Sequence, residues 1–303
     1  MEKKTRAIKR RRTIPTCLAL FLACASLKAN QGETVTHTGL TNLDRFSIGN
    51  DSLIVAYYGR PKAAYMGIVG RYSKEDIVAR VKATANGYRS IAGGKIVRPA
   101  LYLIYGTCWP EGKIGYLSDA MTHEYIRYAL EQDTLVILDH QIGASSLKDA
   151  IDWLLPYLVY PNVHIALDFE WRTAKPMKEI GFVRGEELTW IQEYVQDYLS
   201  RKSIPGKRYV VFHQFAKSML RNPDGIVSSH PQVELVHCTS GWGPPEDKVS
   251  THAINSAITQ IPLKGFKLWY HYSDKPGIHY DDPLMSPGAV LALSPAPFLV
   301  IYQ

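Results

Sequence analysis

The chain has 303 residues, of which 46% are hydrophobic and 21% are charged, a composition typical of a globular protein that buries a large core. Its formal net charge of +7 arises at the N-terminus, because residues 1–29 hold eight of the 35 basic and one of the 28 acidic residues. The rest of the chain carries 27 of each, which excludes the basic surface that nucleic-acid binding requires, so no nucleic-acid partner is expected.

Residues 1–25 have the features of a secretion signal. Basic residues extend to Arg12, and the apolar stretch 14–25 that follows is too short to act as a stable membrane anchor. Two processing sites compete: Ala23-Cys24-Ala25 fits ordinary signal peptidase, whereas Phe21-Leu22-Ala23-Cys24 resembles a lipoprotein box in which Cys24 is acylated. The protein is therefore expected to be exported, either secreted or held in the periplasm or at the cell surface, with membrane contact only through such a lipid anchor.

Residues 26–50 are polar, rich in glycine and without periodicity, which predicts a flexible tether before a folded part at 51–303. From residue 51 onward, short β-rich runs alternate with amphipathic stretches. The predicted strands are 53–58, 100–105, 135–139, 164–169, 209–214, 234–238, 267–272 and 298–302. The predicted helices are 73–91, 122–132, 147–158, 186–201 and 249–261, with weaker ones at 216–221 and 287–293.

This alternation predicts a parallel sheet covered by helices, and eight strands match a closed (β/α)8 TIM barrel of the α/β class, folded as a single domain. An open doubly wound sheet is the alternative, but the turn after the first strand, Tyr57-Tyr58-Gly59-Arg60-Pro61, lacks the glycines of a nucleotide site. The first helix is expected to begin at Ser73, because Asp76 follows at capping-box spacing. Cys108 and Cys238 end the second and sixth strands on opposite sides of the barrel, so we expect free, buried thiols.

In such barrels the chemistry lies where the strands end, at the carboxy-terminal mouth. The fourth strand ends in Asp168 and Glu170, which the alternation of a strand would point to one side, and the third strand ends in Asp139. Two neighbouring carboxyl groups can divide their roles, one protonated and the other ionised, as the cleavage of a glycosidic bond requires. Glu170 has the longer side chain nearer the mouth and is the predicted general acid, Asp168 assists it, and Asp139 is a third candidate acid.

Other side chains at the strand ends are candidates for substrate binding, through hydrogen bonds or by stacking on sugar rings. They are Tyr58, Gln141, His213, Gln214, Trp269 and Tyr270. A structural role is the competing interpretation, in which Arg60, Arg172 or a buried tyrosine neutralises the acid pair. The histidines His140, His237 and His271 match no compact metal motif, so neither a metal nor another cofactor is expected.

The run ALDFEWR, residues 166–172, resembles the D-x-E strand end of lysozyme-type muramidases and, more loosely, that of chitinase-like glycosidase barrels. The resemblance implies that Glu170 is the general acid and that Asp168 assists. The chain departs from both patterns: Val163 and Ala166 replace aspartates of the chitinase-like motif, and the first strand lacks the muramidase aspartate.

A longer set of motifs spans the first five predicted strands: AYYGRP (56–61), MGIVG (66–70), LDHQIG (138–143), ALDFEWR (166–172) and VVFHQF (210–215). Together they are similar to those of a family of uncharacterised exported bacterial proteins with glycoside-hydrolase-type TIM barrels.

Three functions agree with these features. The first is a glycoside hydrolase that acts on a polysaccharide or a cell-wall glycan. The second is a metal-assisted hydrolase, for example of phosphodiesters, built on the same three acids and nearby histidines. The third is a non-catalytic carbohydrate-binding barrel of the cell envelope. The first and third require a carbohydrate partner; the pattern makes no prediction about the sugar, the linkage, the stereochemistry or the oligomeric state.

Overall fold

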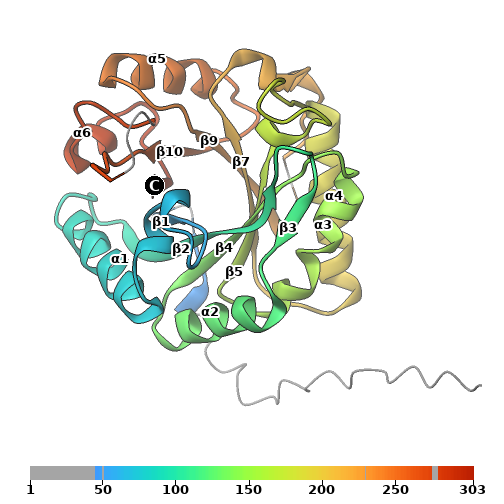
Figure 1. The fold of residues 1–303 in the computed structure, drawn as a ribbon, viewed down its shortest axis with the longest axis horizontal. Coiled ribbons are helices and arrows are strands. Elements are labelled where there is room, and N and C mark those ends of the chain that lie inside the picture. The colour runs from blue at the N-terminus through green and yellow to red at the C-terminus, as the bar shows by residue number, and fades with distance from the viewer. Residues whose placement is uncertain (1–44, 50, 229, 275–278) are drawn as a thin grey trace, which may run out of the picture. The chain divides into compact units, whose positions relative to one another are not determined.

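The computed structural model describes residues 45–49, 51–228, 230–274 and 279–303. Within these ranges, eight parallel strands close into a barrel and helices surround it (Figure 1). The sheet closes because β1 pairs on one side with β2 and on the other with β11. The strands are β1 (Ser52–Gly59), β2 (Ile96–Cys108), β4 (Leu135–Gln141), β5 (Val163–Asp168), β7 (Arg208–Gln214), β9 (Val233–Thr239), β10 (Leu263–Leu268) and β11 (Leu299–Tyr302). The predicted (β/α)8 barrel is confirmed.

The helices follow the strands in the expected alternation. They are α1 (Lys74–Arg89), α2 (Asp119–Glu131), α3 (Leu147–Asp152), α4 (Gly185–Arg201), α5 (Pro245–Ser256) and α6 (Pro287–Leu291). Helix α1 begins as predicted: the Ser73 hydroxyl accepts a hydrogen bond from the Asp76 backbone N–H at 3.1 Å and donates one to the Asp76 carboxylate at 2.8 Å. The first of these bonds satisfies a backbone donor that the first turn leaves without a partner inside the helix.

Several predicted boundaries were wrong, and helix α3, for example, ends six residues before the predicted 158. Strand β10 begins and ends four residues before the predicted 267–272, so Trp269 and Tyr270 follow the strand. Helix α5 begins at Pro245, four residues before the predicted start. The weak helix predicted at 216–221 is a 3₁₀ turn at Lys217–Met219 followed by β8 (Leu220–Arg221), which pairs with β6 (Val183–Arg184). A short strand, β3 (Ile114–Tyr116), also pairs antiparallel with the end of β2.

Side chains on the two faces of the strands form two separate cores. Outward-facing residues such as Ile165, Leu167 and Phe169 pack beneath the helices, as the alternation of β5 predicts. Inward-facing residues fill the barrel, and small ones such as Ala56, Ala100 and Ala166 leave space for larger neighbours. The barrel interior is therefore a packed core below the mouth.

The amino-terminal end of the barrel is closed by residues predicted to be part of the tether. Phe46 and Ile48 are buried in the inner core, and the backbone carbonyl of Ile48 accepts a hydrogen bond of 2.8 Å from the Tyr209 hydroxyl. The packed part of the chain thus includes residues 45–49, before the predicted start at 51. The predicted signal sequence, Cys24 and residues 26–44 lie outside the described residues. None of the helices in the described ranges combines the length and hydropathy needed to cross a bilayer.

Candidate active site

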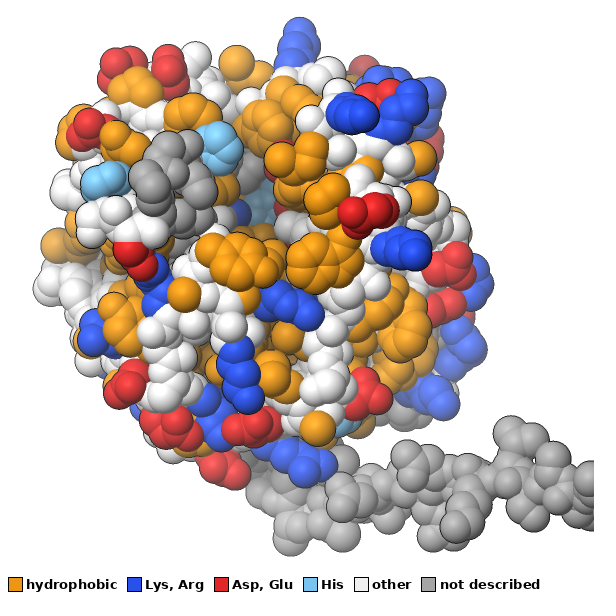
Figure 2. Space-filling model, viewed as in Figure 1, with side chains coloured by type: hydrophobic (Ala, Val, Ile, Leu, Met, Phe, Trp, Pro, Cys, Tyr) orange, Lys and Arg blue, Asp and Glu red, His pale blue; other side chains and the backbone are white. Residues whose placement is uncertain are grey.

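The three predicted acids lie together at the carboxy-terminal mouth of the barrel. Asp139 is paired in register with Ala166, and Asp168, one pleat further along β5, is paired with Gln141, so both carboxyl groups face the barrel axis. Asp139 is fully buried, Asp168 is 6% exposed, and Glu170 is partly exposed above them. The face into which the mouth opens is hollowed at its centre, with hydrophobic side chains along the rim (Figure 2).

Glu170 reaches the mouth from a turn, whereas the sequence predicted a continuing strand. Strand β5 ends at Asp168, and Phe169–Trp171 form a 3₁₀ turn. The Asp168 carboxylate accepts a hydrogen bond of 3.3 Å from the Glu170 backbone N–H, and the Glu170 carbonyl accepts one of 2.8 Å from Gly181. The peptide groups before and after Glu170 are therefore both fixed. The turn, and not the alternation of a strand, places the Glu170 side chain beside Asp168.

Burial raises the pKa of all three acids, and repulsion from Asp168 raises that of Asp139 and Glu170 further. The pKa of Glu170 rises to about 7, first because the carboxyl is buried and then because Asp168 is close. The pKa of Asp139 rises to about 8 for the same two reasons. The pKa of Asp168 rises to about 6 through burial, while Lys267 opposes the rise. Asp168 is therefore the first of the three to ionise, and Glu170 can hold a proton near neutral pH.

Tyr58 links the first strand to this group of acids. Its hydroxyl donates a hydrogen bond of 2.9 Å to Asp139 Oδ2. A bridge between Gly59 and Gly67 holds the chain just after Tyr58, and a Cβ at Gly67, whose φ is 109°, would lie 2.5 Å from the Tyr58 carbonyl oxygen. The glycines of the AYYGRP and MGIVG motifs thus permit the close contact that positions Tyr58.

The arginines that could have neutralised the acids bind elsewhere. Arg60 donates to the Thr107 hydroxyl at 2.7 Å and to the carbonyl oxygens of Gly115 and Tyr116, so it fastens the β2–β3 hairpin. Arg172 makes two hydrogen bonds, of 2.9 and 2.7 Å, to the Glu187 carboxylate. The cation that faces the acids is Lys267 of β10, a residue that was not among those predicted from the sequence.

The predicted binding residues divide into those that face the barrel interior and those that do not. His213 faces inward, and its Nε2 forms a hydrogen bond of 2.8 Å with the Tyr102 hydroxyl; burial lowers the pKa of His213 well below its ordinary value. Gln141 also faces inward, but its side-chain oxygen accepts a hydrogen bond of 2.9 Å from the Cys108 backbone N–H. Gln214 lies on the outer face, where its side chain bonds to His237 at 2.8 Å and to the Ala216 carbonyl at 3.2 Å.

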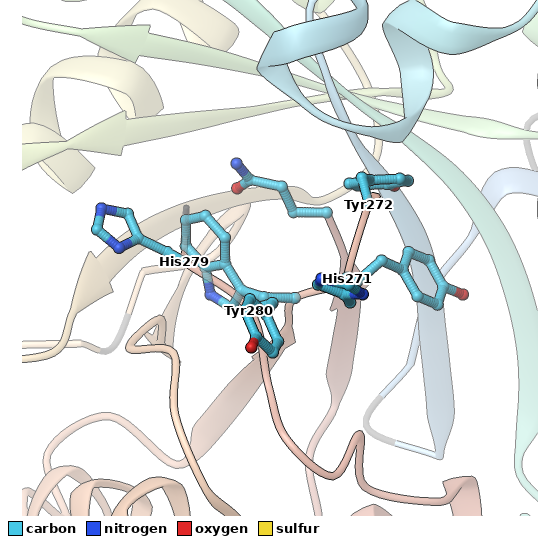
Figure 3. Close-up of a pocket in the computed structure, with 7 residues that line it drawn as sticks. His271, Tyr272, His279 and Tyr280 are labelled. Carbon is cyan, nitrogen blue, oxygen red and sulfur yellow. The ribbon is translucent and has the colours of Figure 1, made fainter. Parts of the chain in front are cut away.

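The two predicted aromatic platforms also differ in their surroundings. Trp269 lies next to the barrel interior, with its ring centroid 4.5 Å from Lys267 Nζ and its indole N–H bonded to the Ser240 carbonyl at 2.9 Å. Tyr270 stacks on Tyr302, with ring centroids 5.3 Å apart, as part of the outer packing. Both line a small aromatic pocket, around which the labelled rings of His271, Tyr272, His279 and Tyr280 are arranged (Figure 3).

The metal-assisted interpretation has no ligand set in the described part of the chain, where no three His, Cys, Asp or Glu side chains form a group able to hold a metal ion. His140 and His237 alternate with inward-facing neighbours and lie on the outer face of their strands. His140 packs against Tyr116, and His237 stacks on Phe212 with ring centroids 4.6 Å apart. Cys108 and Cys238 are free, buried thiols.

Comparisons with known proteins find likeness only among solved structures, since no protein-family model and no curated protein matches the chain. A GH138 enzyme targeting pectin rhamnogalacturonan II matches 82% of this chain with a TM-score of 0.43 and 14% identity. This chain spans only 34% of that enzyme's length. A GH5-4 broad specificity endoglucanase from Clostridum cellulovorans matches 86% of each chain with a TM-score of 0.44 and 11% identity. At these values nothing about the chemistry of this chain follows from the likeness.

Proposed function

We propose that this protein is a glycoside hydrolase that acts on a polysaccharide or a cell-wall glycan, with Glu170 as general acid and Asp168 as its ionised partner. The observation that carries the proposal is the pair itself: two carboxyl groups at the barrel mouth, two residues apart, whose pKa values are raised to about 7 and about 6. Such a pair holds one proton and one negative charge at near-neutral pH, and glycosidic bond cleavage uses both.

The proposed chemistry assigns a separate task to each acid. The Glu170 carboxyl donates its proton to the glycosidic oxygen as the bond from the sugar carbon to that oxygen breaks. The negative charge of Asp168 stabilises the positive charge that develops on the sugar ring in the transition state, and a water molecule adds to the sugar carbon and gives up a proton to complete the hydrolysis. Asp139 is fully buried and its pKa is raised to about 8, so near neutral pH it accepts the hydrogen bond of Tyr58 without adding a full second negative charge.

A carbohydrate substrate is further supported by exposed aromatic side chains on the loops of the mouth. Trp109 follows β2 and is 40% exposed, and Trp242 follows β9 and is 52% exposed. Trp242 stacks on His279 with ring centroids 4.5 Å apart, which fixes the orientation of its indole. A flat, oriented and exposed ring is a surface on which a pyranose can stack.

The test replaces the proton donor by its neutral isostere. Glu170→Gln is expected to lower turnover of polysaccharides and peptidoglycan, measured as new reducing ends, at least about 100-fold, because Gln cannot donate the proton. Glycan binding and the unfolding temperature should stay close to wild type. The matched control is Glu179→Gln, since Glu179 is exposed and pairs with Lys175 on the surface. A fully active Glu170→Gln protein would contradict the assignment.

The same assays separate the two alternatives. Turnover that a chelator abolishes would favour the metal-assisted hydrolase, whereas glycan binding without turnover by the wild type would favour a non-catalytic carbohydrate-binding barrel.

Export is part of the proposal, and Cys24 decides its form. In cell fractionation, loss of the protein from the membrane fraction in Cys24→Ala would support a lipid anchor. An unchanged, fully released protein would support cleavage by ordinary signal peptidase.

A further inference from the structure

A lysine lies inside the barrel, close to the carboxyl groups of the proposed active site. Lys267 is 4% exposed. Its Nζ lies 3.6 Å from the ring centroid of Tyr58 and 4.5 Å from that of Trp269. Lysine side chains are rarely buried unless a partner balances their charge. Two aromatic faces attract the ammonium but do not neutralise it, so a negative charge close by is required.

The groups that face Lys267 come from most strands of the barrel, and the acids dominate among them. Burial lowers the pKa of Lys267, and Asp168 opposes this most strongly, followed by Asp139, Cys238 and Glu170. His213 of β7 is neutral and adds no charge, because burial and Lys267 itself lower its pKa. Tyr58 and Tyr102 keep their protons, since burial raises their pKa well above the ordinary value. The balancing negative charge must therefore come from a carboxylate.

The backbone that carries Lys267 is held by a second, separate ion pair. Lys248 Nζ lies 3.1 Å from Asp281 Oδ1 and donates a hydrogen bond of 2.7 Å to the Lys267 carbonyl. Asp281 Oδ2 accepts a hydrogen bond of 3.0 Å from the Trp269 backbone N–H. Both side chains of this pair are buried. The two peptide groups that follow Lys267, on either side of Leu268, are thus fixed, which anchors the backbone that carries the ammonium.

We propose that Lys267 is a positioning residue of this site: its buried ammonium holds Asp168 in the ionised form and so leaves the transferable proton on Glu170. The inference rests on the proposed glycosidase function for its catalytic meaning. The effect of Lys267 on the ionisation of Asp168 can be tested without measuring turnover. Among the charged groups that act on Asp168, Lys267 lowers its pKa the most. For Glu170, repulsion from Asp168 raises the pKa by more than attraction to Lys267 lowers it.

The test follows the carboxyl groups directly by 13C NMR of side-chain carboxyl carbons between pH 4 and 9. In wild type, Asp168 should titrate below Glu170, and a 13Cε-labelled Lys267 should stay protonated from pH 6 to 8. In Lys267→Met, which keeps the side-chain length and removes the charge, the apparent pKa of Asp168 should rise by about one unit or more, so that it no longer ionises before Glu170.

Lys264→Met is the matched control. Lys264 is buried on the same strand, but its Nζ donates to the carbonyl oxygens of Asn255 and Ile258 at 3.0 and 2.9 Å, away from the acids. The Lys264→Met substitution should therefore leave the titrations of Asp168 and Glu170 unchanged. Unchanged titration of Asp168 in Lys267→Met would overturn the proposal. If that variant does not fold, a wild-type Lys267 that is neutral at pH 6 would overturn it equally.

Turnover provides the catalytic readout. In Lys267→Met the acidic limb of the pH–rate profile should move upward with the pKa of Asp168, whereas loss of a merely structural lysine would lower the rate at every pH without moving that limb. If the titration of Asp168 shifts in Lys267→Met but the wild-type protein cleaves no glycan, the proposed function is refuted and the control of ionisation by Lys267 still holds.

Discussion

Tyr58 donates a hydrogen bond of 2.9 Å to one oxygen of Asp139, and the other oxygen of that carboxyl has no hydrogen-bond partner among the described residues. Burial makes this carboxyl costly to ionise, and repulsion from Asp168 adds to the cost, which together raise its pKa to about 8. The pair joins β1 to β4 across the interior of the barrel. It is thus both a structural contact and the deepest part of the proposed active site.

Tyr58→Phe removes this bond without changing the shape of the ring. We expect a loss of about 1–3 kcal/mol in the free energy of unfolding, because the buried Asp139 carboxyl then lacks the hydrogen bond that Tyr58 donates. Urea unfolding monitored by circular dichroism measures it. Tyr57→Phe is the control, since its hydroxyl bonds to Thr84 on the outer face. In a double-mutant cycle with Asp139→Asn, a coupling energy of zero would show that the bond does not contribute.

Asp139 also makes stability depend on pH. Its pKa is raised above the ordinary value, so between about pH 4 and 8 the native protein keeps a proton that the unfolded chain has lost, and stability falls as the pH rises. The buried histidines act in the opposite sense below pH 6.5, so the useful window is pH 6.5–8.5. Asp139→Asn cannot ionise. The free energy of unfolding of wild type should therefore fall by about 1–2 kcal/mol more across this window than that of the variant. Parallel pH profiles would contradict this.

The fold was predictable because eight short β-rich runs recur along the sequence, most of them separated by amphipathic stretches. Outward-facing apolar residues and small inward-facing residues alternate along β5, and Ala166, Asp168 and the outward Leu167 were assigned to the correct faces. Asp139 and Asp168 are neighbours because β4 and β5 pair in parallel with both side chains facing inward. The turn at Phe169–Trp171 was not predictable, because it depends on hydrogen bonds to Asp168 and Gly181, and Gly181 is distant in sequence.

The misplaced strand β10 explains why Lys267 was missed. Lys264 and Lys267 interrupt the apolar run at 263–268, and a lysine within a strand normally indicates a solvent-facing position. The predicted strand, 267–272, therefore began at Lys267 and continued into the aromatic residues, which placed Lys267 at the amino-terminal end of the strand, away from the mouth. The signal that could have found Lys267 was its spacing: it alternates with the outward-facing Phe266 and Leu268, as an inward-facing residue does.

The burial of Phe46 and Ile48 at the amino-terminal end of the barrel was not predicted for a related reason: two apolar residues in a polar segment show no periodicity. Phe46→Ala should lower the free energy of unfolding by about 3 kcal/mol, since it removes a buried ring from the inner core. Chemical denaturation of the full chain measures it. Ile180→Ala, at an exposed position, is the control and should have an effect below about 0.5 kcal/mol. Equal stabilities of the two variants would show that residues 45–49 do not contribute to the fold.

The pH dependence of turnover follows from the two acids of the proposed mechanism. Activity requires Asp168 ionised and Glu170 protonated, so kcat/KM should fall below about pH 6 as Asp168 takes up a proton and above about pH 7 as Glu170 loses one. The profile should therefore be a narrow bell with its maximum between these values. In Asp168→Asn the acidic limb should disappear, while the alkaline limb should move to lower pH, because the repulsion that raises the pKa of Glu170 is gone. An alkaline limb that stays in place in Asp168→Asn would assign the proton to a group other than Glu170.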